Sequence, residues 1–199
     1  MKYCLFFLTV LAISFPNIFA QEVFSEDFEE GLFPEGWTTF IHEAGIETWG
    51  ISSYSSLFMG RAGVSAALDV ENTLNQKWLV SPRINLVSNS TLEFYATDDE
   101  DQDLMSGLII YVTTGSDSSD IDAYDYITSF QEDDITTHGK LQKFTLDLSE
   151  YGTQSVHIAF VMAGFHGGHW YLDNINVGET FADDIQLLSL ETETTYSYF

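Results

Sequence analysis

The chain has 199 residues, of which 31 are Asp or Glu and only 6 are Lys or Arg, giving a formal net charge of −25. So acidic a composition excludes nucleic acid and anionic membranes as partners, because both are bound through basic surfaces. The negative charges also repel one another in the folded state, so we expect divalent cations or a saline environment to stabilise the protein.

The first twenty residues, MKYCLFFLTVLAISFPNIFA, have the layout of a secretory signal peptide, with Lys2, an apolar run and the small residue Ala20 at the cleavage position. The apolar run is short for a membrane span, which needs about 20 apolar residues. We therefore predict a secreted or cell-surface protein that is cleaved after Ala20 and has no membrane insertion afterwards. The single cysteine, Cys4, lies in this segment, so residues 21–199 can form no disulfide and hold no thiol nucleophile.

Short segments in which apolar and polar residues alternate follow one another from Val23 to Val177. The clearest are TLEFYAT (91–97), GLIIYVTT (107–114), KFTLDL (143–148) and SVHIAFVM (155–162). A period of two is typical of β-strands, and Gly, Ser, Asn and Asp gather between the segments as turns require. We predict one all-β domain over residues 21–178, an antiparallel two-sheet β-sandwich (jelly roll) of roughly ten to twelve strands. Residues 179–199 are expected to form a C-terminal extension, either an extra strand or the start of a following module.

Two segments between the expected strands are acidic and irregular, TDDEDQD (97–103) and TGSDSSDIDAYD (114–125). Each is interpreted either as a solvated loop or as a calcium-binding loop. Neither has the EF-hand spacing D-x-[DN]-x-[DN]-G-x5-E, so the pattern alone does not favour calcium.

A histidine pair, His166 and His169, stands in the segment FHGGHW on either side of a Gly-Gly turn. A zinc site needs about three protein ligands in a near-tetrahedral arrangement. Because neither an H-E-x-x-H motif nor a cysteine accompanies the pair, we interpret both residues as surface histidines that flank a tight β-turn.

Five motifs, taken together in their order, resemble a known family. They are SEDFEEGLFPEGW (25–37), KWLVSPRINL (77–86), LEFYA (92–96), LIIYVTTG (108–115) and WYLDNINV (170–177). This order resembles the cleaved-adhesin family, also called the choice-of-anchor J domain, over residues 23–177. That module recurs in the haemagglutinin-adhesin regions of gingipain-type proteases and in exported proteins of the Bacteroidetes. The resemblance implies a jelly-roll sandwich similar to MAM domains and to several carbohydrate-binding modules.

The same resemblance implies an exported, non-catalytic adhesin or binding module with an extracellular glycan or protein ligand. The alternatives are a structural spacer in a larger surface assembly and a glycoside-active jelly-roll enzyme. The E-x-D-x-x-E strand motif of laminarinase-like enzymes and the G-x-S-x-G elbow are both absent from the sequence, so we predict no enzyme. Trp37, Trp49, Trp78 and Trp170 are expected mostly in the core, and an exposed aromatic cluster on one face would favour a binding module over a spacer.

Calcium is the cofactor that the resemblance implies. In similar jelly rolls a calcium ion commonly joins the first strand to the last. Carried over to this sequence, the ligands are Asp27 and Glu29 from the first strand and Asp173 from the last, completed by backbone carbonyls. Alternation along YLDNINV places Asp173 on the same face as Ile175 and Val177, where a carboxylate needs a cation or several donors.

The first strand leaves a second possibility open. Its alternation places Glu26, rather than Asp27, between Phe24 and Phe28 on the apolar face, so Glu26 is held as a reserve ligand. A solvated acidic strand end, with no metal, is the alternative to both.

Overall fold

The computed structural model describes residues 22–43, 48–53, 63–67, 75–98, 105–164 and 168–179. The predicted signal peptide and all but the first residue of the predicted extension lie outside these ranges, as do residues 99–103 of the first acidic segment and His166. The expectations for these residues therefore stay predictions.

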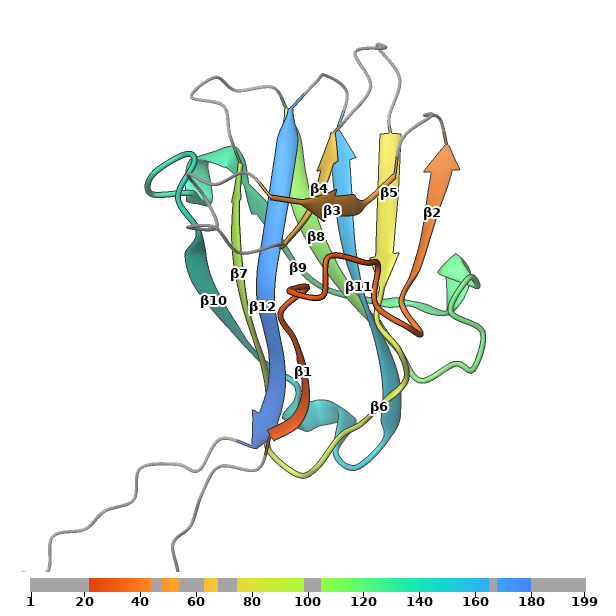
Figure 1. Cartoon of the computed structure of the whole chain (residues 1–199). Helices are drawn as coiled ribbons and strands as arrows, with labels where there is room; N and C mark the ends of the chain where they lie inside the picture. The colour runs from red at the N-terminus through yellow and green to blue at the C-terminus, as the bar shows by residue number, and fades with distance from the viewer. Residues whose placement is uncertain are drawn as a thin grey trace, which may run out of the picture.

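The described residues form two six-stranded sheets in which every strand pair is antiparallel. Sheet A has the order β10-β7-β12-β4-β3, with β1 paired to β12, and sheet B has the order β2-β5-β11-β8-β9, with β6 paired to β11. Figure 1 shows the two sheets facing each other as two layers, which confirms the predicted antiparallel β-sandwich.

Sheet A consists of β1 (Glu22–Glu26), β3 (Gly50–Ser52), β4 (Gly63–Ala67), β7 (Ser90–Asp98), β10 (Gln142–Asp147) and β12 (His169–Glu179). Sheet B consists of β2 (Thr38–Glu43), β5 (Asn75–Val80), β6 (Ile84–Asn85), β8 (Ser106–Thr113), β9 (Asp125–Gln131) and β11 (Ser155–Gly164). The helical elements in the described ranges are three short 3-10 helices, η1 (Ile121–Ala123), η2 (Glu132–Asp134) and η3 (Ser149–Tyr151). None of them could span a membrane.

The main core fills the space between the sheets. Phe94 of sheet A and Phe160 of sheet B meet there edge to face, with ring centroids 5.3 Å apart. Trp37, Trp49 and Trp170 are buried in the same core, as predicted. The strands supply these residues by simple alternation: on β11, every second residue from Val156 to Met162 belongs to this core.

The fourth tryptophan, Trp78, is also buried but on the other side of sheet B. It belongs to a second cluster together with Val80, Ala159 and Val161, whose side chains point away from sheet A. Sheet B therefore has apolar side chains on both faces, which explains the nearly continuous apolar runs in β8 and β11.

Candidate functional site

The first and last strands of the domain lie side by side. β1 pairs antiparallel with β12, with Glu26 opposite Ile175. Asp27 directly follows this pair on β1, and Asn174 and Asp173 directly precede it on β12. Figure 1 shows β1 beside β12. The register thus brings Asp27 and Asp173 to the same end of this strand pair, although they are far apart in the sequence.

Asp173 lies at a β-bulge. The register between β12 and β7 shifts between Asp173 and Asn176, and Asn174 has a positive φ of 49°. The bulge reverses the alternation, so Ile175 and Val177 enter the main core while Tyr171 packs against Leu141 elsewhere. The expectation that Tyr171, Asp173, Ile175 and Val177 share one face is therefore wrong, because a bulge adds one residue and changes the side on which the following residues lie.

Asp173 is nevertheless buried, with 1% of its surface exposed. Its Oδ1 accepts the backbone N–H of Asn174 at 2.7 Å, and its Oδ2 accepts the Asn174 side-chain amide at 3.0 Å. A buried carboxylate needs donors or a cation, and at this bulge the neighbouring asparagine supplies donors to both oxygens.

The loop after β1 is held by its apolar residues. Phe28, with a positive φ of 55°, and Trp37 are both buried, and their ring centroids lie 5.5 Å apart. Gly36 has a φ of 84°, and a Cβ there would lie 3.1 Å from Cγ of Pro82, so the turn before Trp37 requires glycine. Anchoring at Phe28 and Trp37 leaves the acidic residues between them on the surface.

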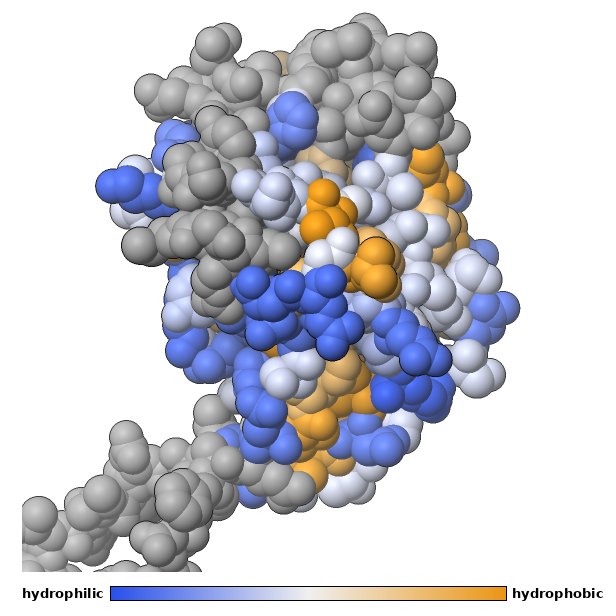
Figure 2. All heavy atoms as spheres, viewed as in Figure 1, coloured by the Kyte–Doolittle hydropathy of each residue, from blue (hydrophilic) through white to orange (hydrophobic). Residues whose placement is uncertain are grey.

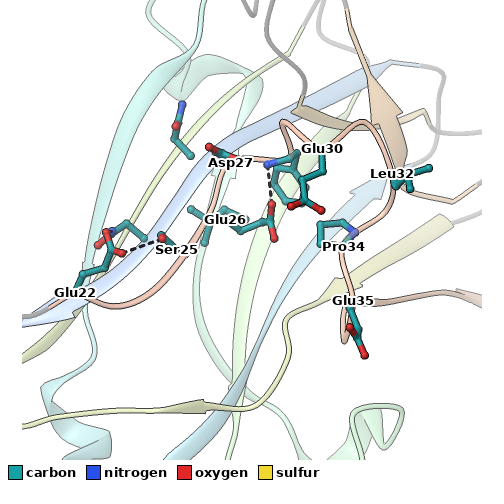
Figure 3. Close-up of a pocket in the computed structure, with 12 residues that line it drawn as sticks. Glu22, Ser25, Glu26, Asp27, Glu30, Leu32, Pro34 and Glu35 are labelled. Carbon is teal, nitrogen blue, oxygen red and sulfur yellow. Dashed lines mark hydrogen bonds between the residues drawn. The ribbon is translucent and has the colours of Figure 1, made fainter.

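A pocket of about 540 Å³ opens beside this loop (Figure 3). Its charged lining consists of carboxylates, from Glu22, Glu26, Asp27, Glu30 and Glu35. Figure 2 shows the surface over β1 and the following loop, where hydrophilic residues lie beside apolar ones. Glu26 is half-buried, and its Oε1 accepts the backbone N–H of Phe28 at 2.7 Å, so the turn itself already uses one oxygen of this reserve ligand.

The predicted calcium ligands are only partly gathered. Asp27 and Asp173 lie at one end of the β1–β12 pair, whereas Glu29 is exposed two residues further along. Asp27 Oδ1 accepts the Glu29 backbone N–H at 3.1 Å. Within the described ranges, no three His, Cys, Asp or Glu side chains are grouped closely enough to hold a metal ion. An ion that binds here would need backbone carbonyls to complete its six to eight oxygens.

The outer face of sheet B, which points away from sheet A, is a second candidate. Sequence reasoning did not single it out, although the apolar runs in β8 and β11 that cover both faces of a sheet were a usable signal. The register places the following described residues on this face: Thr38, Phe40, His42, Gln76, Trp78, Val80, His157, Ala159, Val161, Ala163, Gly107, Ile109, Tyr111, Thr113, Tyr126, Ser129 and Gln131.

Trp78 is the centre of an aromatic cluster on this outer face. Its ring stacks on Phe40 at 5.4 Å and on Tyr111 at 5.2 Å, and it meets Tyr124 edge to face at 5.3 Å. The small Ala159 lies between the strands of Trp78 and Tyr111, which lets the two rings approach across β11. Only 3% of Trp78 is exposed, so its ring faces contact other rings and leave none free for a ligand.

Tyr126 is the exposed member of this aromatic row. Its ring meets Tyr111 edge to face at 5.9 Å, and 59% of the residue is exposed. Its hydroxyl donates to Ser129 Oγ at 3.1 Å. On β5, at another part of the same face, Gln76 Oε1 accepts the indole N–H of Trp78 at 3.2 Å, which leaves the amide –NH2 of this half-buried side chain as a donor.

The second acidic segment covers one end of the outer face. Its Ile121 and Tyr124 pack on the cluster, and the Tyr124 hydroxyl donates to the Ser118 carbonyl at 3.0 Å. Arg83 holds the start of the segment by donating to the carbonyls of Gly115 and Thr114 at 2.6 and 3.0 Å. The segment is thus a packed loop, and its Asp117 binds the Ser119 backbone N–H at 2.9 Å.

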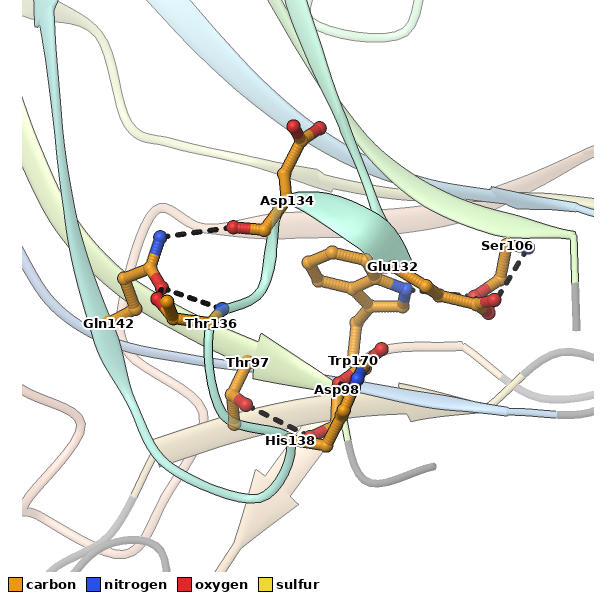
Figure 4. A network of polar contacts seen from close by, with 9 residues as sticks. All are labelled: Thr97, Asp98, Ser106, Glu132, Asp134, Thr136, His138, Gln142 and Trp170. Carbon is orange, nitrogen blue, oxygen red and sulfur yellow. Dashed lines mark hydrogen bonds and ion pairs between the residues drawn. The ribbon is translucent and has the colours of Figure 1, made fainter. Parts of the chain in front are cut away.

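A buried polar network closes one end of the sandwich (Figure 4). Glu132 accepts from the Ser106 hydroxyl, and Ser106 Oγ in turn accepts the indole N–H of Trp170 at 3.0 Å. Asp98 Oδ1 lies 2.6 Å from His138 Nδ1. Asp98 is only 2% exposed, and this burial raises the pKa of its carboxyl group. The hydrogen bond and the charge of His138 lower the same pKa, but burial has the larger effect.

The raised pKa of Asp98 predicts a pH-dependent stability. A carboxyl group whose pKa is higher in the folded state than in the unfolded state makes the folded protein more stable at low pH than at high pH. This contribution to the free energy of unfolding is fully present below the unfolded pKa, about 3.9, and is lost as the pH rises through the folded pKa. Asp98→Asn keeps the shape and cannot ionise, so its melting temperature relative to the wild type should increase as the pH rises above the unfolded pKa of about 3.9 and level off above the folded pKa. Thermal melts of both proteins from acidic to neutral pH test the prediction, and a difference that does not change with pH contradicts it.

His169 is exposed, as predicted for a surface histidine, and its ring lies 6.2 Å from that of Tyr171. Its predicted companion His166 lies outside the described residues. No metal-binding group involves His169 within the described part of the chain.

Two antiparallel sheets packed face to face, with an aromatic outer face on one of them, place the protein in the class of β-sandwich modules. No family model and no curated protein matches the chain by sequence.

Solved structures do match. The K3 cleaved adhesin domain of Lys-gingipain from Porphyromonas gingivalis has a TM-score of 0.59 at 20% identity, over 81% of this chain and 99% of that one. The K1 domain of the same protein has a TM-score of 0.57 at 18% identity, over 79% and 98% of the two chains. TmCBM61, solved in complex with β-1,4-galactotriose, has a TM-score of 0.55 at 12% identity, over 77% and 94%. The predicted resemblance to cleaved adhesin domains is thereby confirmed at the level of the fold.

Proposed function

We propose that this protein is an exported, non-catalytic binding module that takes a glycan on the outer face of sheet B. The observation that carries the proposal is the exposed ring of Tyr126, seated beside Tyr111 with the hydroxyl of Ser129 next to it. Sugar rings have apolar faces that pack on aromatic rings and hydroxyls that pair with amides and hydroxyls. Tyr126 supplies the ring and Ser129 a polar group beside it, while Gln76 offers an amide elsewhere on the same face.

The fold is compatible with this role. TmCBM61 was solved with β-1,4-galactotriose on a similar sandwich, and the other neighbours are cleaved adhesin domains of Lys-gingipain. Export rests on the signal peptide predicted over residues 1–20. A pure spacer is the alternative, and it predicts that Tyr126 contributes nothing to ligand binding.

The test is a binding measurement with Tyr126→Ala. A glycan that the wild type binds should lose affinity about tenfold or more in this variant, because a central aromatic contact typically contributes at least 1.4 kcal/mol. Tyr126→Phe should retain most of the affinity, since the ring remains and only the hydroxyl is lost. Phe33→Ala provides the control, because Phe33 is an exposed aromatic residue on the loop beside the acidic pocket. Equal binding by wild type and Tyr126→Ala across glycans would favour the spacer.

Calcium is the second part of the proposal. Asp27, Glu29 and Asp173 would hold the ion with backbone carbonyls and so clamp β1 to β12. The β1–β12 register supports this, because it places Asp27 and the buried Asp173 at one end of the pair. The net charge of −25 supports it as well, since a bound cation offsets local repulsion among the carboxylates. The ion would have a structural role, away from the outer face of sheet B.

A further inference from the structure

The outer face of sheet B carries no Asp, Glu, Lys or Arg at any of the described positions named above for it. Its polar groups are amides, hydroxyls and the rings of His42 and His157. In a chain with 31 acidic residues, so large a face without a carboxylate is unusual. The outer face of sheet A differs: Glu93 and Lys143 lie there 2.8 Å apart, and Asp147 stands on the same strand as Lys143.

Acidic residues lie around this face rather than on it. The packed loop at one end carries the exposed Asp120 and Asp122, and η2 follows β9 directly with the exposed Asp133 and Asp134. The arrangement is a face without Asp, Glu, Lys or Arg, which we call the floor, with an acidic border, and the described floor therefore offers no Lys or Arg to pair with a negative ligand.

We infer that this face selects uncharged glycans and rejects those that carry a carboxylate or sulfate; the inference rests on the proposed glycan-binding function. A uronate or sulfate placed on the face would lose its water without gaining a partner, which is costly for a charge, and the acidic border would repel it. Neutral hydroxyls, by contrast, pair with Gln76, Gln131 and Ser129 at no such cost.

The test is a glycan array that contains pairs differing only by one uronate or sulfate, probed in about 0.5 M NaCl to screen the overall charge of the protein. We expect Tyr126-dependent binding on uncharged members, at least about tenfold weaker binding on each charged counterpart, and little change in the binding of the uncharged members when the salt is lowered. Tyr126-dependent binding that is strongest on charged glycans would overturn the inference and leave the proposed function intact. If no glycan shows Tyr126-dependent binding, the proposed function itself fails.

A charge placed on the floor gives an independent check. Ser129→Lys adds a cation beside Tyr126 and should raise the affinity for the uronate-bearing member of a pair relative to its neutral counterpart. Thr145→Lys makes the same charge change on the exposed outer face of sheet A and should leave that ratio unchanged. If both variants shift the ratio equally, the selectivity comes from the net charge of the protein and the inference is wrong.

Discussion

Trp78→Ala is expected to destabilise the domain by about 3–5 kcal/mol, as much as truncation of an aromatic residue in the main core. Trp78 lies outside the space between the sheets, yet it is 3% exposed and contacts the rings of Phe40, Tyr111 and Tyr124. Its removal leaves a cavity among three rings that belong to three different segments. For a domain of this size each kcal/mol corresponds to roughly 2–4 °C in melting temperature.

Chemical denaturation of the wild type and Trp78→Ala measures this cost directly. The matched control is Tyr126→Ala in the same aromatic row, which should cost less than about 1 kcal/mol because the ring is mainly exposed. The contrast separates the structural role of Trp78 from the proposed ligand-binding role of Tyr126. A loss below about 1 kcal/mol for Trp78→Ala would mean that the loop carrying Tyr124 does not cover the tryptophan in solution.

Millimolar calcium, compared with a chelator, is expected to raise the melting temperature by several degrees. A ligand that binds only the folded state stabilises it by RT ln(1 + [L]/Kd), about 2.7 kcal/mol at a hundredfold excess over Kd. That corresponds to roughly 5–11 °C for a domain of this size. The proposed ion would join strands from opposite ends of the domain, a role that disulfides cannot fill because the only cysteine is Cys4.

General screening of the net charge would also stabilise the fold, so sodium chloride at matched ionic strength is the first control. Asp173→Ala should abolish the calcium-specific increase and keep the salt effect. Asp98→Asn, which changes a buried carboxylate in the polar network with His138, should keep both effects. If calcium stabilises the wild type and Asp173→Ala equally, the ion binds elsewhere, and the acidic segment 98–103 becomes the next candidate.

Period-two alternation, which is local, was sufficient to predict the strands from the sequence. The predicted segments 143–148 and 155–162 correspond to β10 and β11, and their alternating apolar residues lie in the main core. Side chains two residues apart on a strand point to the same face, so an alternating apolar pattern is buried on one side. The burial of the four tryptophans was equally predictable, because large rings with a single polar atom favour the interior.

Only the tertiary structure shows which residues lie on the inner and outer faces of the two sheets. Alternation along 171–177 could not reveal the bulge at Asn174, because a bulge depends on pairing with β7 and β1 rather than on the strand itself. Trp78 was expected in the core, but only the stacking of the sheets shows that it belongs to the outer face of sheet B. The absence of charge on that face is likewise invisible in the sequence. Its residues come from five strands scattered between positions 38 and 163, and only the register of sheet B brings them together.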